Sequence, residues 1–103
     1  MRLTAEDRTE LSREPNDAIR TAYRVLASQE IHFNSLLRCP IPGRSQATVR
    51  KVYVNRVTDL VILAGDEAER LEGVTSPRAT LLRGCLVDLH DTATRHFRRI
   101  LDS

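Results

Sequence analysis

Apolar residues recur along most of this chain at separations of three and four, which is the spacing of one face of an α-helix. The clearest run lies between Ser45 and Leu71, and a second run extends from Pro77 to Leu101. Between the two runs, Thr75 or Ser76 can cap the free amides of a helix, and the proline that follows suits its first position. The pattern therefore predicts two long helices joined by a short connection.

Two further helices are predicted in the first half of the chain. Thr4 can cap a short helix, with Asp7 completing a capping box. A longer helix opens at Pro15, and its apolar stripe continues to the break at residues 39–43, where two prolines forbid helix. Gly65 followed by an aspartate could divide the third helix. We expect that helix to continue, because the apolar spacing keeps its phase through this point.

These elements predict an all-α fold, an antiparallel bundle of three long helices plus a short N-terminal helix. At 103 residues the chain is expected to form a single helical domain, 1–103. With 41% hydrophobic residues and few aromatics, the core must consist largely of aliphatic side chains. The predicted core residues are Ala22, Leu26, Phe33, Leu37, Val52, Leu60, Ala64, Leu82, Leu86, Leu89, Ala93 and Phe97.

Sequence features that would indicate a membrane or an export route are not found. The longest apolar run, Leu60 to Ala64, is far shorter than the roughly 20 residues that cross a bilayer. The first residues include acidic side chains where a signal peptide would need an apolar segment. Cys39 and Cys85 form no paired motif and are expected to be reduced. Together these features predict a cytoplasmic protein.

The basic residues are almost all arginine, which suits both ion pairs and phosphate contacts. One group surrounds the proline loop and the start of the third helix, and it comprises Arg38, Arg44, Arg50, Lys51 and Arg56. Another lies near the C-terminus and comprises Arg95, Arg98 and Arg99. From the first group we take Arg44, Arg50, Lys51 and Arg56 as candidates for binding nucleic acid or an acidic partner. The alternative is that these side chains form only a solvated face.

Candidate catalytic chemistry is limited to one pair. Arg83 and His90 are seven positions apart and share a helix face. The pair resembles the R-x4-6-H motif of the HEPN family, small helical bundles that include dimeric ribonuclease toxins. The resemblance implies that Arg83 would bind the scissile phosphate of RNA and His90 would act as the acid or base. A ribonuclease or a toxin-antitoxin component is therefore the enzymatic alternative.

Metal and cofactor sites lack support in the sequence. The three histidines, His32, His90 and His96, have no histidine or cysteine at the spacing that places two metal ligands on one helix face. Gly-rich phosphate loops, nucleophile elbows and dinucleotide-binding fingerprints are also missing. We therefore predict no metal and no cofactor.

The second half of the chain carries another family resemblance. Residues 49–60 form a helix with a tyrosine and an arginine before a hydrophobic pair, residues 74–77 restart a helix at Thr-Ser-Pro, and residues 94–101 end in Arg-His-Phe followed by Ile-Leu. From about Thr48 onward this order resembles the helical A domain of GINS subunits, which join the replicative helicase and polymerase. The resemblance implies a scaffold role in DNA replication.

Apolar residues outside the main stripes favour a role in association. Ile19, Ile31, Val54 and Ile62 lie opposite or beside the predicted core faces, where a small bundle would leave them uncovered. Together with Tyr23, which flanks an apolar stripe, Ile19, Val54 and Ile62 form the candidate partner interface, and a homodimer is the simplest way to bury it. The sequence thus favours a non-enzymatic helical interaction or assembly protein.

Overall fold

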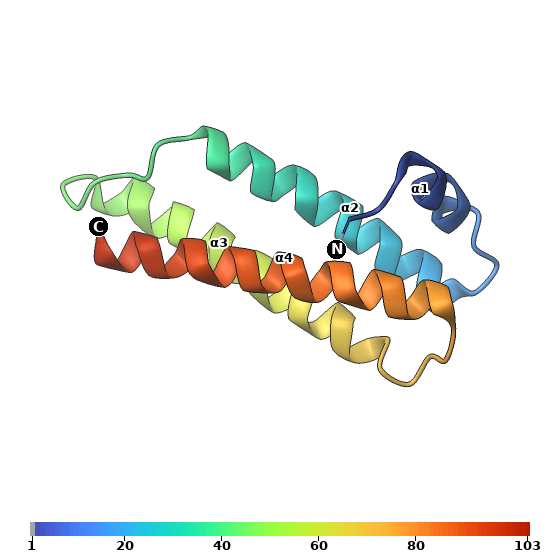
Figure 1. Ribbon diagram of the computed structural model, residues 1–103. Coiled ribbons are helices and arrows are strands. Elements are labelled where there is room, and N and C mark those ends of the chain that lie inside the picture. The colour runs from blue at the N-terminus through green and yellow to red at the C-terminus, as the bar shows by residue number, and fades with distance from the viewer. Residues whose placement is uncertain (1) are drawn as a thin grey trace.

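The computed structural model describes residues 2–103, which form four helices and no strand (Figure 1). The helices are α1 (Ala5–Ser12), α2 (Asp17–Arg38), α3 (Ala47–Arg70) and α4 (Pro77–Asp102). α2 and α4 run in the same direction and α3 runs opposite to both, giving an elongated bundle of 48 × 25 × 20 Å (Figure 1). The all-α fold with one short and three long helices is confirmed.

Hydrogen bonds at the helix ends explain where two of the helices begin. The Thr4 hydroxyl accepts from the Asp7 amide at 3.0 Å, and the Asp7 carboxylate accepts from the Thr4 amide at 2.9 Å, which completes the predicted capping box. The bond from the Thr4 amide lowers the pKa of Asp7. At α4, the Ser76 hydroxyl accepts from the Ala79 amide at 3.1 Å and Pro77 occupies the first turn, as predicted.

α2 begins later than the sequence pattern indicated. The side chain of Asn16 accepts from the amides of Ala18 and Ile19 at 3.0 and 3.2 Å, so the helix is capped at Asn16 and Pro15 stays outside it. An Asn cap satisfies two amides that Pro15 could not reach, since proline offers no side-chain acceptor.

The predicted continuity of α3 is confirmed, because the helix runs through Gly65 without a break. A Cβ atom at this position would lie 3.2 Å from Cδ2 of His90 on α4. The glycine therefore gives the His90 ring room where α3 and α4 cross. Glycine has a lower helix propensity than alanine, and the close packing of His90 explains why it is nevertheless found inside α3.

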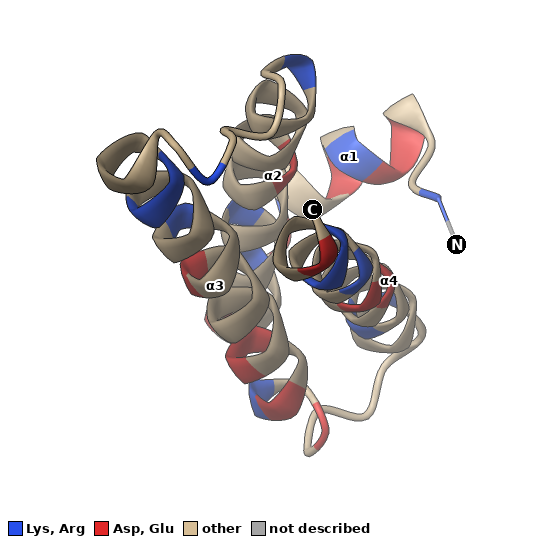
Figure 2. Cartoon of the chain, turned by 90° about the vertical axis from the view of Figure 1, so that its left-hand side faces the viewer, with Lys and Arg blue, Asp and Glu red and all other residues tan. Residues whose placement is uncertain are grey.

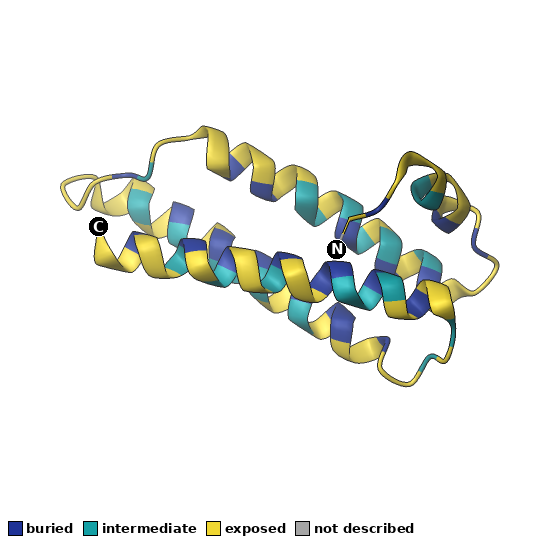
Figure 3. Ribbon diagram, in the orientation of Figure 1, coloured by how far each residue is buried: buried dark blue, intermediate teal, exposed yellow. Residues whose placement is uncertain are grey.

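The core lies where α3 packs against α4 along most of their length, with α2 over both and α1 against α2 (Figure 3). Most of the predicted core is buried, namely Ala22, Leu26, Phe33, Leu60, Ala64, Leu82, Leu86, Leu89 and Ala93, and Phe97 is partly buried. Leu37 and Val52 are half-exposed, so their assignment to the core was wrong. α3 instead turns Tyr53, Val57 and Leu60 inward, which places Val52 on its outer flank.

α1 is held to the bundle by buried leucines and by ion pairs. Leu3 and Leu11 belong to the core. Arg78 on α4 reaches the carboxylates of Glu10 at 3.1 Å and Glu14 at 2.7 Å. The hydrogen bond from Arg78 lowers the pKa of Glu14, so this carboxylate stays ionised where the turn after α1 contacts α4.

The packing predicts opposite outcomes for two neighbouring residues of α4. Leu86 is fully buried, whereas Val87 is exposed. Leu86→Ala should lower the free energy of unfolding by about 2–5 kcal/mol, because it removes buried methyl groups and leaves a cavity. The matched control Val87→Ala should change it by less than about 0.5 kcal/mol. Urea denaturation followed by circular dichroism measures both, and equal losses would contradict this core.

Candidate interaction surfaces

An apolar seam follows the outer side of the α3/α4 contact. We call it the α3/α4 seam, and it comprises Val54, Thr58, Val61, Ile62, Thr94, Phe97 and Leu101. At its centre is a cavity of about 110 Å³ with an apolar lining. The hydroxyl of Thr58 donates to the Val54 carbonyl at 2.9 Å and that of Thr94 to the His90 carbonyl at 2.8 Å. Because both hydroxyls are bonded within their own helices, the seam offers chiefly methyl and ring surface.

The four predicted interface residues do not share one surface. Val54 and Ile62 lie on the α3/α4 seam, where Ile62 is 53% exposed. Ile19 is only 3% exposed and belongs to the core, so its prediction as a surface residue was wrong. It faces inward because α2 packs one side on α3 and α4 and another on α1. Tyr23 is half-buried on α2, away from the other two.

A larger groove of about 630 Å³ separates α2 from α3. Its lining is mixed, and it consists of Gln29, Ile31, His32, Ser35, Leu36, Cys39, Arg56, Asp59, Leu60 and Leu63. Arg56, predicted as a phosphate or partner ligand, lies here rather than with the other three basic candidates. Among residues 2–103, no three His, Cys, Asp or Glu side chains gather as a metal site would require.

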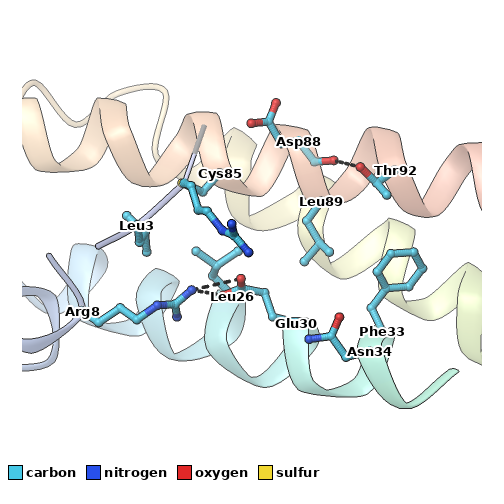
Figure 4. Close-up of a pocket in the computed structure, with 11 residues that line it drawn as sticks. Leu3, Arg8, Leu26, Glu30, Phe33, Asn34, Cys85, Asp88, Leu89 and Thr92 are labelled. Carbon is cyan, nitrogen blue, oxygen red and sulfur yellow. Dashed lines mark hydrogen bonds and ion pairs between the residues drawn. The ribbon is translucent and has the colours of Figure 1, made fainter. Parts of the chain in front are cut away.

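The groove between α2 and α4 is polar but largely satisfied from within. Figure 4 shows Arg8 reaching from α1 to Glu30 on α2, where one guanidinium nitrogen contacts both carboxylate oxygens at 3.1 and 3.2 Å. This hydrogen bonding raises the pKa of Arg8. Cys85 is buried beside this groove, and burial raises the pKa of its thiol, which keeps it protonated and unreactive. The groove measures about 530 Å³, and Arg2 and Asp88 also line it.

The candidate catalytic pair lies on α4. Arg83 and His90 are both half-buried, and seven positions in a continuous helix place them on one side. Nδ1 of His90 lies 3.1 Å from a carboxylate oxygen of Asp91, and the ring packs against Gly65. Neither residue lines any of the grooves described above.

Three of the four basic candidates meet where α3 begins and α4 ends. Arg44, Arg50 and Lys51 line a cavity of about 460 Å³ together with Ala47, Val54 and Leu101. The guanidinium of Arg50 donates to the Pro42 carbonyl at 2.7 Å and to the Ile100 carbonyl. Arg50 therefore ties the proline loop to the last turn of α4, whereas Lys51 is exposed.

A buried polar chain that sequence reasoning missed joins the three long helices. The Tyr53 hydroxyl donates to the Leu36 carbonyl at 3.0 Å, and Nε2 of His96 lies 2.8 Å from the same hydroxyl. Since tyrosine has one hydrogen to give, Nε2 of His96 must carry a proton and donate to Tyr53. Nδ1 of His96 is then a buried acceptor without a partner. The apolar stripe through Ala93 and Ile100 could have indicated that His96 is buried.

The surroundings of His96 oppose its protonation. The ring packs edge-on against Phe33, with 5.9 Å between ring centroids, and it is screened from solvent. Burial, and secondarily the charge of Arg99, lowers the pKa of His96 below the ordinary value of 6.5. Burial also raises the pKa of Tyr53, so both groups of the chain stay neutral near pH 7.

This arrangement predicts how stability depends on pH. The unfolded chain binds the His96 proton more readily than the folded one, so stability is fully present above pH 6.5 and falls as the pH drops toward the folded-state pKa. The loss should reach at most about 1.4 kcal/mol per pH unit. Urea denaturation between pH 7.5 and 5.5 measures it.

Two variants make that measurement specific. In His96→Leu the pH-dependent loss of stability should disappear, because the buried imidazole is no longer present. Tyr53 keeps its hydrogen bond to the Leu36 carbonyl in this variant. In His32→Gln, which changes an exposed histidine, the loss should persist. An unchanged pH dependence in His96→Leu would show that the buried imidazole is not its source.

Comparisons with known proteins do not assign this chain to a family. Searches of protein families, curated proteins and solved structures found no match to the chain. Within the part of the chain that the structure describes, no helix is both long enough and apolar enough to span a bilayer.

Proposed function

We propose that this protein is a non-enzymatic helical assembly protein that forms a homodimer through the α3/α4 seam. The observation that carries the proposal is the α3/α4 seam itself, where the exposed Ile62 and Leu101 and partly buried apolar side chains surround a cavity that no charged residue lines. A seam of this kind, rimmed by polar residues, is typical of protein interaction sites.

The α3/α4 seam offers apolar side chains that a partner would cover. Ile62 and Leu101 are 53% and 54% exposed, and Val54, Val61 and Phe97 beside them are only partly buried. The aromatic ring of Phe97 and the side chain of Ile62 lie near its middle. Central apolar anchors with a polar border are the usual source of affinity in such interfaces.

Charges on the same flank of α3 favour an antiparallel arrangement of two copies. Successive separations of three and four place Lys51, Ile62 and Glu69 on one flank, with Asp66 beside them. The basic residue lies at one end of this flank and the acidic residues lie at the other. A two-fold axis across the seam would therefore bring unlike charges together at both ends, which is the complementarity an isologous dimer needs.

A charge placed on the seam should break the dimer. Ile62→Glu is expected to weaken self-association by more than about 100-fold, because burying an unpaired carboxylate costs about 3–5 kcal/mol. Ile31→Glu on α2 is the matched control, since Ile31 is 67% exposed and lies away from the seam. Sedimentation equilibrium over a concentration series measures both, with circular dichroism to verify folding.

Two results would overturn this assignment. A wild-type chain that stays monomeric at the highest soluble concentration would exclude the dimer. Dissociation by Ile31→Glu together with full retention in Ile62→Glu would move the interface to the α2/α3 groove, whose lining includes Ile31.

The two family resemblances stay hypotheses about this chain. A GINS-like role would give the proposed assembly a setting in DNA replication. The ribonuclease alternative requires that Arg83→Ala and His90→Ala abolish RNA cleavage in a folded protein, and the structure supplies no added observation in its favour beyond their shared helix side.

A further inference from the structure

Basic residues from separate parts of the chain gather at one end of the bundle. We define the basic end as residues 35–56 and 95–103, where α2 ends, α3 begins and α4 ends. It contains eight basic residues and one acidic residue, for a net charge of +7, while the whole chain carries +2. The remainder therefore carries −5. Figure 2 looks onto this end and shows blue segments from all three long helices facing the viewer.

Within the described part of the chain, ion pairs form only away from the basic end. There, four of the eight arginines, namely Arg8, Arg20, Arg70 and Arg78, each pair with a carboxylate. Among the ion pairs found within residues 2–103, none involves a side chain of the basic end. Arg44 and Arg50 bond to backbone oxygens and to the Ser103 hydroxyl, and to no Asp or Glu side chain.

The cavity at this end has the same character. It measures about 460 Å³, and Arg44, Arg50 and Lys51 line it without any carboxylate. Guanidinium groups present paired donors that match phosphate oxygens. A cluster of this kind concentrates anions at the surface.

We infer that the basic end binds the phosphate backbone of duplex nucleic acid. Figure 2 shows the basic segments on all three long helices and on the loop between α2 and α3, across the end of the bundle rather than along one line, which fits two phosphate strands better than a single extended peptide. About 25 Å of duplex carries roughly 15 phosphate charges, more than the number of basic residues at this end.

The basic end is poorly suited to binding single-stranded nucleic acid or to recognising individual bases. Stacking on unpaired bases requires exposed aromatic rings. At this end Tyr53 is buried and Phe97 is half-buried in the α3/α4 seam. The expected contacts are therefore to phosphate, which fixes position without selecting sequence. The basic end and the α3/α4 seam share Val54, Phe97 and Leu101, whereas the arginines at 38, 95, 98 and 99 lie outside the residues that define the seam.

The test is fluorescence anisotropy with a labelled 20-base-pair DNA duplex of arbitrary sequence. With about six phosphate contacts, affinity should fall by about a thousandfold between 50 and 200 mM salt. Arg38→Ala with Arg98→Ala should weaken binding at least about tenfold and lower the salt slope by nearly two. The matched control, Arg13→Ala with Arg24→Ala, removes the same charge from exposed sites on the rest of the chain and should leave the slope unchanged.

Several outcomes would overturn the inference. They are the absence of duplex binding at low salt, equal weakening in both double variants, and tighter binding of a single strand than of the duplex. Competition by poly-glutamate as effective as that of duplex, at equal charge, would identify an acidic protein as the partner instead. Repeating the titration with Ile62→Glu separates this site from the seam, since loss of the dimer should leave duplex affinity within about threefold.

Discussion

The contact between α3 and α4 is the interaction on which the rest of the structure depends. Small residues, Ala64 and Ala93, are completely buried along it, and Gly65 gives the His90 ring room at the crossing. Fully buried leucines such as Leu60 and Leu86 fill the space beside them. Packing of this density fixes the relative rotation of the two helices. That rotation decides which residues form the outer seam and which face α2.

α2 is joined to this pair by a different kind of contact. Tyr53 and His96 reach from α3 and α4 to the Leu36 carbonyl near the end of α2, and Arg50 ties the following loop to α4. The neutral imidazole of His96 and the phenol of Tyr53 can be buried here because each donates a hydrogen bond to the next group, from His96 to Tyr53 and from Tyr53 to the Leu36 carbonyl. Polar groups thus position α2 at the end of the bundle where apolar packing is thinnest, as the half-exposed Leu37 shows.

The distribution of charge follows from these same contacts. Loop residues and two helix ends that are far apart in the sequence come together because α2 and α4 are parallel and α3 returns between them. The carboxylates that pair with arginine lie on α1, in the turn after it, on α2 and near the end of α3. Among the residues that the structure describes, the arginines of the basic end are not ion-paired. The chain therefore has a small net charge as a whole, but its positive charge is concentrated at one end of the bundle.

The four helices, the caps of α1 and α4 and most of the core could be predicted from the residue pattern, because these depend on local spacing and on side chains within a few residues. The capping box at Thr4, the restart at Ser76 and the continuity through Gly65 are of this kind. Other features depend on how the helices pack. Whether Val52 or Tyr53 faces inward, whether Ile19 is buried, and which arginines are ion-paired depend on how helices rotate against one another. Those rotations are set by contacts between distant residues, which a single sequence pattern does not encode.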